Sequence, residues 1–149
     1  LKIAGDGPFR NTLENLIQQY QLESNVKILG EISHDEVYKF LNDLNIYIQP
    51  SFSEGSPVTL KEAMASGLPI LASDAGGIPE IIENKITGFI FQKGNLKELK
   101  TSLLKIMKLD HKKKRKIGSM ARKKAKEMYD INSTYKKLIS FYKEILNKK

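Results

Sequence analysis

Short apolar runs alternate with amphipathic stretches along the first 92 residues of the chain. The apolar runs predict strands at residues 1–4, 26–29, 46–49, 69–73 and 89–91. Between these runs, apolar residues recur at the spacing of a helix face, as they do at Phe9, Leu13, Leu16, Ile17 and Tyr20. Repeated strand–helix units favour parallel pairing, because the helix returns the chain to the edge where the next strand begins. The pattern predicts an α/β fold with a Rossmann-like parallel sheet flanked by helices.

After residue 94 the pattern becomes helical throughout. Apolar spacing predicts three successive helices, around residues 96–107, 117–121 and 135–145. A chain of 149 residues fits a single domain with a real core. We therefore expect an α/β body at residues 1–92 and a helical extension at residues 95–149. The chain opens directly in a strand pattern without Met, so we expect a fragment that lacks its first strand–helix unit or units.

The loops that follow the predicted strands contain the candidate functional residues. In doubly wound folds, ligands bind outside the carboxyl ends of the strands. Those ends lead into residues 5–7, 30–31, 51–56 and 73–77. The sequence therefore predicts one site on one rim of the sheet.

Glu54 and Glu62, with seven residues between them, are the most informative pair in the sequence. Ser56 and Pro57 are typical of an N-cap and a first helical turn. Glu54 is then expected in the loop before the helix, and Glu62 about one turn inside it. The free amides of the first turn, at Val58, Thr59 and Leu60, suit a phosphate group.

Residues 50–69 (PSFSEGSPVTLKEAMASGLP) resemble the donor-site motif of retaining nucleotide-sugar glycosyltransferases, which have two Rossmann-like domains in the GT-B arrangement. Further segments follow in that family's order and spacing: residues 1–8 (LKIAGDGP), 26–30 (VKILG), 46–51 (IYIQPS), 74–80 (DAGGIPE) and 87–89 (TGF). The resemblance covers residues 1 to about 92. It implies that the chain is one half of a GT-B fold, the C-terminal donor-binding domain.

The resemblance implies transfer of a hexose-type sugar from a nucleoside diphosphate sugar to a glycan or lipid-linked acceptor. It assigns to Glu54 contact with the transferred sugar near the reacting carbon, and to Glu62 hydrogen bonds from the ribose hydroxyls. The alternative for each carboxylate is a solvated surface side chain without a functional role. The family generally needs no metal for catalysis, and the chain suggests neither a metal site nor a cofactor.

Glycine-rich turns complete the predicted donor site. Gly55 and Pro57 shape the turn and let the sugar and phosphates approach the main chain. Ser56 stands where many relatives have a bulky residue. The other expected contacts are Gly5 and Gly7 after the first strand, Gly30, Glu31 and Ile32 around the base, and Gly76 and Gly77 facing the diphosphate or sugar. Asp6 either contributes to this site or caps the following helix.

Two elements of the family are expected upstream of Leu1. They are the Arg and Lys that clamp the donor diphosphate, and the N-terminal acceptor-binding domain. The chain alone is therefore expected to be inactive. The alternative is a non-catalytic nucleotide-binding or scaffold module on the same fold. A dinucleotide cofactor is disfavoured, because residues 5–7 lack the third glycine of that fingerprint.

Charge is distributed unevenly along the chain. Residues 1–100 contain 9 Lys/Arg and 13 Asp/Glu, whereas residues 101–149 contain 16 Lys/Arg and 4 Asp/Glu. The run from His111 to Lys116 lacks the interleaved aromatics that single-stranded nucleic acid favours, so no nucleic-acid partner is expected. Two alternatives remain for this run: a solvated helix face, or contact with an anionic membrane surface.

The sequence shows no signal peptide and no membrane-spanning segment, and it contains no cysteine. We therefore expect a cytoplasmic protein. If the basic run contacts a membrane, we expect that contact at the membrane's inner face.

Overall fold

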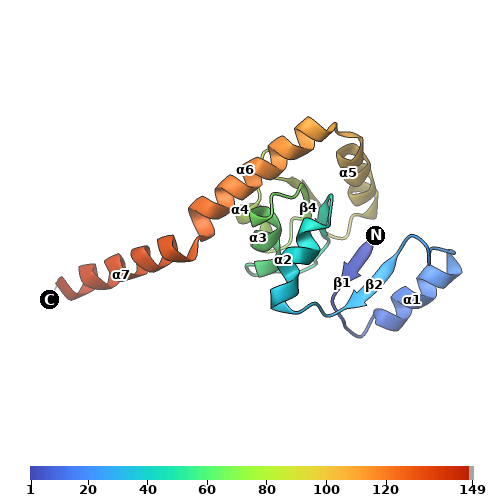
Figure 1. Ribbon diagram of the computed structural model, residues 1–149, viewed down its shortest axis with the longest axis horizontal. Coiled ribbons are helices and arrows are strands. Elements are labelled where there is room, and N and C mark those ends of the chain that lie inside the picture. The colour runs from blue at the N-terminus through green and yellow to red at the C-terminus, as the bar shows by residue number, and fades with distance from the viewer. Residues whose placement is uncertain (148–149) are drawn as a thin grey trace. The chain divides into compact units, whose positions relative to one another are not determined.

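The computed structural model describes residues 1–147 (Figure 1). The chain divides into two compact units, Leu1–Phe40 and Leu41–Lys149. Each unit is a parallel α/β arrangement with a sheet of its own. No helix within residues 1–147 is both long enough and apolar enough to cross a bilayer.

The first unit is built on a parallel strand pair. Strand β1 (Lys2–Ala4) pairs with β2 (Lys27–Gly30), and α1 (Arg10–Gln19) connects them. Helix α2 (His34–Asn42) follows β2 and begins where the Ser33 hydroxyl donates a hydrogen bond to the Glu36 carboxylate. This side-chain bond, which favours the ionised carboxylate, lowers the pKa of Glu36.

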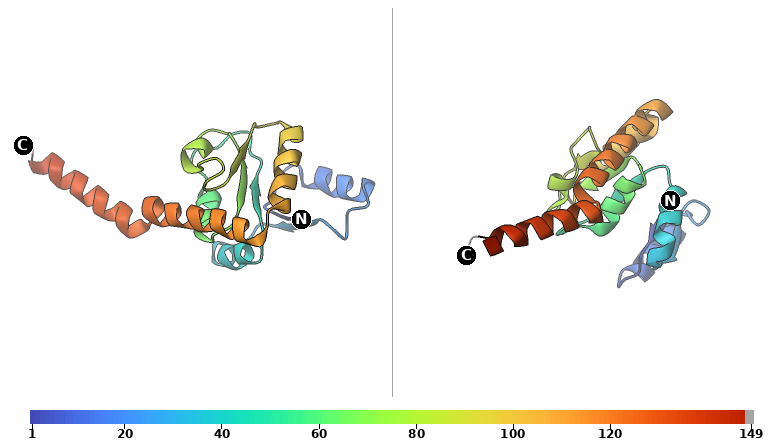
Figure 2. Two further views of the ribbon diagram at one scale, coloured as in Figure 1. Left: turned by 90° about the horizontal axis from the view of Figure 1, so that it is seen from above. Right: turned by 60° about the vertical axis from the view of Figure 1, so that its left-hand side comes forward.

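The second unit contains a three-stranded parallel sheet. Its strands are β3 (Tyr47–Gln49), β4 (Ile70–Ser73) and β5 (Phe89–Phe91), in the order β3-β4-β5. The connections are α3 (Val58–Ala65) and the short α4 (Ile78–Ile81). The chain then continues through α5 (Leu96–Lys108), α6 (His111–Tyr129) and α7 (Ile131–Asn147). Figure 2 shows α7 extending away from this sheet beyond the end of α6.

One hydrophobic cluster of the second unit's core lies between its sheet and α5. The buried side chains of Leu71, Phe91 and Ile106 form its centre. Partly buried residues of β3, β5 and α5, and Ile46 directly before β3, pack around them: Ile46, Ile48, Phe89, Leu99 and Leu103. Helix α5 is amphipathic, and its N-cap is Asn95, whose side chain accepts a hydrogen bond from the Glu98 amide. The first helix after residue 94 thus covers the sheet.

The fold class predicted from the sequence is confirmed, and each of the five predicted strands lies within one residue of an observed strand. Three helices follow the last strand of the described residues, also as predicted. The expectation of one sheet differs from the structure, which has a two-stranded and a three-stranded sheet. Apolar periodicity identifies strands, but it does not specify which strands pair.

Helix α6 packs closely on the end of α3, and the two lie side by side in Figure 1. Gly67 follows α3 in the left-handed region, with φ +75°, as expected for a glycine that ends a helix. A Cβ atom built on Gly118 of α6 would lie 1.9 Å from the Gly67 carbonyl oxygen. Glycine at position 118 is therefore required for this approach of the two helices.

Replacing Gly118 by alanine should destabilise the fold. Alanine favours a helix over glycine by about 1 kcal/mol, but the added Cβ must push α6 away from α3, and overpacking of this kind costs about 1–3 kcal/mol. The overlap with a backbone atom is severe, so we expect a net loss of about 2 kcal/mol in urea unfolding. The neighbouring exposed Ser119→Ala is the control and should change stability by less than about 0.5 kcal/mol. Equal stability of the two variants would contradict this packing.

Candidate functional site

The loops that follow β3 and β4 are joined by hydrogen bonds at the carboxyl end of the three-stranded sheet. The buried Ser73 hydroxyl at the end of β4 donates to the Ser51 carbonyl oxygen at 2.6 Å. The Gly77 amide donates to the Glu54 carbonyl oxygen at 3.3 Å. Two segments that are more than twenty positions apart in sequence thus form one surface.

Gly76 and Gly77 press directly against the backbone of the Glu54 loop. A Cβ atom on Gly76 would lie 1.8 Å from the Glu54 carbonyl oxygen, and one on Gly77 would lie 2.2 Å from the Gly55 carbonyl oxygen. Gly76 also has φ +50°, a conformation that side chains disfavour. The two glycines are therefore needed for packing. Whether they also contact a donor stays a prediction.

The Glu54 carboxylate is held by two donors from its own chain segment. The Gln49 amide nitrogen and the Ser51 hydroxyl both donate to its Oε1 oxygen, each at 2.7 Å. Glu54 itself is half-buried in the loop before α3, as the sequence predicts. Its orientation is therefore set by β3 and by the residues immediately after that strand.

Helix α3 begins at Val58, one residue later than the sequence pattern indicated. The N-cap is Pro57 in an extended conformation, and it makes no side-chain cap hydrogen bond. The prediction that Ser56 is the N-cap is wrong, because the Ser56 hydroxyl instead accepts a hydrogen bond from the Lys61 ammonium group at 2.6 Å. The backbone amides of Val58, Thr59 and Leu60 form the first turn, where no intrahelical partner exists for an N–H group.

Tyr47 on β3 lies within the electrostatic reach of both glutamates. Burial is the largest influence on its phenol and raises its pKa; the charges of Glu54 and Glu62 raise it further, against a hydrogen bond with Thr59 that lowers it. Glu62 is half-buried and stands one turn inside α3. The two carboxylates of the predicted pair therefore share one neighbourhood beside the first turn of α3.

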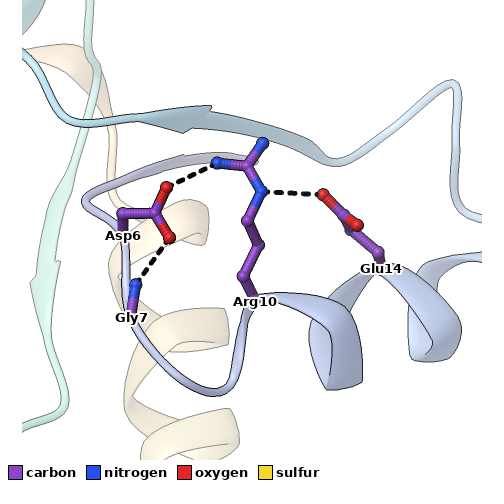
Figure 3. A network of polar contacts seen from close by, with 4 residues as sticks. All are labelled: Asp6, Gly7, Arg10 and Glu14. Atoms are coloured by element: carbon purple, nitrogen blue, oxygen red, sulfur yellow. Dashed lines mark hydrogen bonds and ion pairs between the residues drawn. The ribbon is translucent and has the colours of Figure 1, made fainter.

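In the first unit, the loops after β1 and β2 also meet. The Gly5 amide donates to the Gly30 carbonyl oxygen at 2.7 Å, and both glycines have positive φ angles, +116° and +73°. Beside them, Arg10 donates to Asp6 and to Glu14, at 2.9 Å each (Figure 3). Hydrogen bonds from the Gly7 amide and from Arg10 lower the pKa of Asp6. Asp6 does not cap α1, which begins at Arg10 after an N-cap at Phe9.

The predicted site residues fall into two groups, one in each unit. The second unit brings together Glu54, Gly55, Ser56, Pro57, Val58, Thr59, Leu60, Glu62, Gly76 and Gly77. The first unit contains Gly5, Gly7, Gly30, Glu31 and Ile32, of which Gly5 and Gly30 are in direct contact. No group of three or more His, Cys, Asp or Glu side chains within residues 1–147 is arranged to hold a metal ion.

Sequence reasoning missed the polar side chains that support Glu54. These are Tyr47, Gln49, Ser51 and Ser73. One signal was available, since Gln49 is a polar residue at the end of an apolar strand. Arg10 beside Gly30 was also missed, although acidic residues four positions away on either side mark it in the sequence.

Parallel α/β units with loops at the carboxyl ends of their strands are the arrangement of doubly wound folds, in which ligands bind at that edge. Residues 1–124 match the family described as glycosyl transferases group 1. The chain belongs to that family.

Relatives and solved structures agree with this assignment. The amylovoran biosynthesis glycosyltransferase AmsK of Erwinia amylovora is 36% identical over 110 residues, which are 70% of this chain and 27% of AmsK. Anabaena HepE, solved in complex with UDP-glucose, has a TM-score of 0.85 at 24% identity, over 96% of this chain and 40% of HepE. The C-terminal domain of the group 1 protein LpcC from Francisella tularensis has a TM-score of 0.74 at 27% identity, over 83% of this chain and 63% of that domain. The chain thus spans less than half the length of AmsK and HepE, and it has the fold of a GT-B C-terminal domain.

Proposed function

We propose that this chain is the donor-binding part of a retaining glycosyltransferase. The complete protein would transfer a hexose-type sugar from a nucleoside diphosphate sugar to a glycan or lipid-linked acceptor. The observation that supports this most is the position of Glu54 and Glu62 on either side of the first turn of α3, in a family of glycosyl transferases. The UDP-glucose bound to HepE, a protein of the same fold, supports a nucleotide-sugar ligand.

In this proposal Glu54 acts on the transferred sugar. Glycosyl transfer develops positive charge at the anomeric carbon, which a nearby carboxylate stabilises. A carboxylate can also accept hydrogen bonds from sugar hydroxyls and so orient the ring. The hydrogen bonds from Gln49 and Ser51 hold Glu54 in one orientation for both tasks.

The departing nucleoside diphosphate would bind at α3. The amides of Val58, Thr59 and Leu60 are oriented donors at the positive end of a helix dipole, which suits the negative charge that develops on the leaving group. Glu62, one turn further on, would accept hydrogen bonds from the ribose hydroxyls. Gly55 has open space where a Cβ would stand, so a ligand can approach the main chain there.

We further propose that a first strand–helix unit precedes residue 1. The matched regions are 27% of AmsK and 40% of HepE, which supports a complete protein longer than this chain. The upstream unit would also supply the Arg and Lys that clamp the diphosphate, and the acceptor domain would precede it. Residues 1–149 alone are therefore expected to show no transfer activity.

Titration of the complete protein with a panel of nucleoside diphosphates tests the proposal. One base should bind at least about tenfold more tightly than the others, and the corresponding nucleotide sugars should then be screened for transfer. The anomeric configuration of the product, followed by proton NMR, should match that of the donor. Absence of binding to every nucleoside diphosphate would instead favour a scaffold module.

The basic C-terminal helices are proposed to contact an anionic membrane surface from the cytoplasm. Several cations of α6 already have acidic neighbours: Lys124 contacts Glu83, Lys123 contacts Glu127 and Lys113 contacts Asp110. Even so, residues 101–149 contain four times as many basic as acidic residues. Each Lys or Arg near an anionic bilayer contributes about 1 kcal/mol, and this attraction is lost beyond a Debye length.

Binding to vesicles that contain phosphatidylserine should therefore weaken steeply as salt is added. It should respond little to nucleotide sugar, because the attraction is to charge and not to the donor. Flotation of the protein with these vesicles, compared with flotation with neutral phosphatidylcholine vesicles, measures the binding. If the protein ignores anionic vesicles at low salt, these helices are only a solvated face.

A further inference from the structure

Gln49 is a polar side chain buried at the end of an apolar strand. Only 7% of its surface is exposed. Burying a primary amide is costly unless its hydrogen bonds are made, and both ends of this one are engaged. Its Oε1 accepts from the Tyr47 hydroxyl at 2.9 Å, and its Nε2 donates to Glu54 Oε1 at 2.7 Å and to the Ser51 hydroxyl at 3.4 Å. Gln49 is thus the middle link between Tyr47 and Glu54.

The direction of this chain of hydrogen bonds follows from the charge of Glu54. An ionised carboxylate accepts hydrogen bonds and donates none, so the nitrogen of the Gln49 amide must face it. The Gln49 oxygen then faces Tyr47, whose hydroxyl must donate. Because burial and the two nearby glutamates raise the pKa of Tyr47, the phenol keeps its proton at neutral pH and remains a donor.

Within residues 1–147, the two hydrogen bonds that the Glu54 carboxylate accepts end on the same oxygen. Gln49 and Ser51 both donate to Oε1, so the protein anchors the carboxylate through this oxygen. Oε2 is then the oxygen left to contact a substrate. A carboxylate held in this way needs no reorganisation when charge develops on the sugar.

We propose that Gln49 is a positioning residue for Glu54, which it holds by the Nε2–H···Oε1 hydrogen bond while Tyr47 fixes its amide. The inference rests on the proposed function, since it gives Glu54 the catalytic contact with the sugar. Gln49 itself touches no reacting atom. Its effect on turnover passes entirely through Glu54.

The test uses Gln49→Met in the complete protein, because methionine has a similar length and removes the hydrogen bonds without opening a large cavity. We expect kcat to fall on the order of 10- to 100-fold, as for a misplaced catalytic group, while the Kd for the preferred nucleoside diphosphate stays within about twofold. Tyr47→Phe keeps the ring and removes only the second link, so its kcat should fall by a smaller factor. Gln92→Met, at an exposed position directly after β5, is the matched control and should leave kcat unchanged.

A double-mutant comparison separates positioning from a general structural role. In a Glu54→Ala background, Gln49→Met should change kcat by less than about twofold, because the group that it positions is gone. An equal loss in both backgrounds would overturn the proposal. Unchanged turnover of Gln49→Met, in a protein whose Glu54→Ala variant is nearly inactive, would also overturn the proposal for Gln49. That result would leave the proposed function of Glu54 intact. Full turnover of Glu54→Ala would refute both together.

Discussion

Replacing Glu54 by alanine in the complete protein is expected to lower kcat by about 100- to 1000-fold, the range seen when one preorganised electrostatic group is removed from a site. The Kd for the nucleoside diphosphate should change by less than about threefold, because Glu54 is assigned to the sugar and not to the nucleotide. Initial rates of transfer at saturating donor, together with calorimetric titration, measure the two quantities separately.

The matched control for this substitution is Glu127→Ala. Glu127 is an exposed glutamate on α6, whose contact with Lys123 is long, at 3.9 Å. Its removal should leave both kcat and Kd unchanged. If Glu54→Ala retains turnover similar to that of Glu127→Ala, then Glu54 is a loop carboxylate that has no catalytic role.

Gly76→Ala is expected to have the largest effect on folding. The new Cβ would overlap the Glu54 carbonyl oxygen at 1.8 Å, and the residue would be held at φ +50°. Overpacking and an unfavourable backbone conformation each cost about 1–3 kcal/mol, so we expect a loss of about 3 kcal/mol in free energy of unfolding. Urea denaturation followed by circular dichroism measures this loss.

Gly55→Ala provides the comparison within the same loop. Its Cβ would meet open space, and its φ angle lies outside the left-handed region. We therefore expect stability within about 0.5 kcal/mol of the original chain. Similar losses for Gly55→Ala and Gly76→Ala would show that the close packing of the two loops is absent in solution.

The strands of the fold, and the positions of Glu54 and Glu62 in the second unit, could be predicted from the sequence. Apolar periodicity located all five strands, because strands and helices differ in the spacing of their buried positions. The Glu54 loop and the position of Glu62 one turn into α3 followed from the order of turn-forming and helix-forming residues. These features depend on a few consecutive residues, which is the range over which pattern reasoning works.

Features that depend on tertiary contacts or on side-chain directions could not be predicted from the sequence. Gly76 could be assigned to a turn, but its packing against the Glu54 backbone joins residues more than twenty positions apart. The hydrogen bonds of Gln49 require the side-chain directions at the end of β3, which no periodicity supplies. The N-cap was displaced from Ser56 to Pro57 because Lys61 occupies the serine hydroxyl, a competition that propensities do not register.

The most direct test of the donor-binding assignment is calorimetric titration of the Glu62→Ala variant with the nucleoside diphosphate that the unaltered complete protein binds most tightly. Loss of hydrogen bonds to a charged acceptor is worth about 1.5–3 kcal/mol, so the account predicts that Kd rises by about 10- to 100-fold. Glu127→Ala, measured in parallel, should bind like the unaltered protein. An unchanged Kd for Glu62→Ala would contradict the placement of the nucleotide at α3.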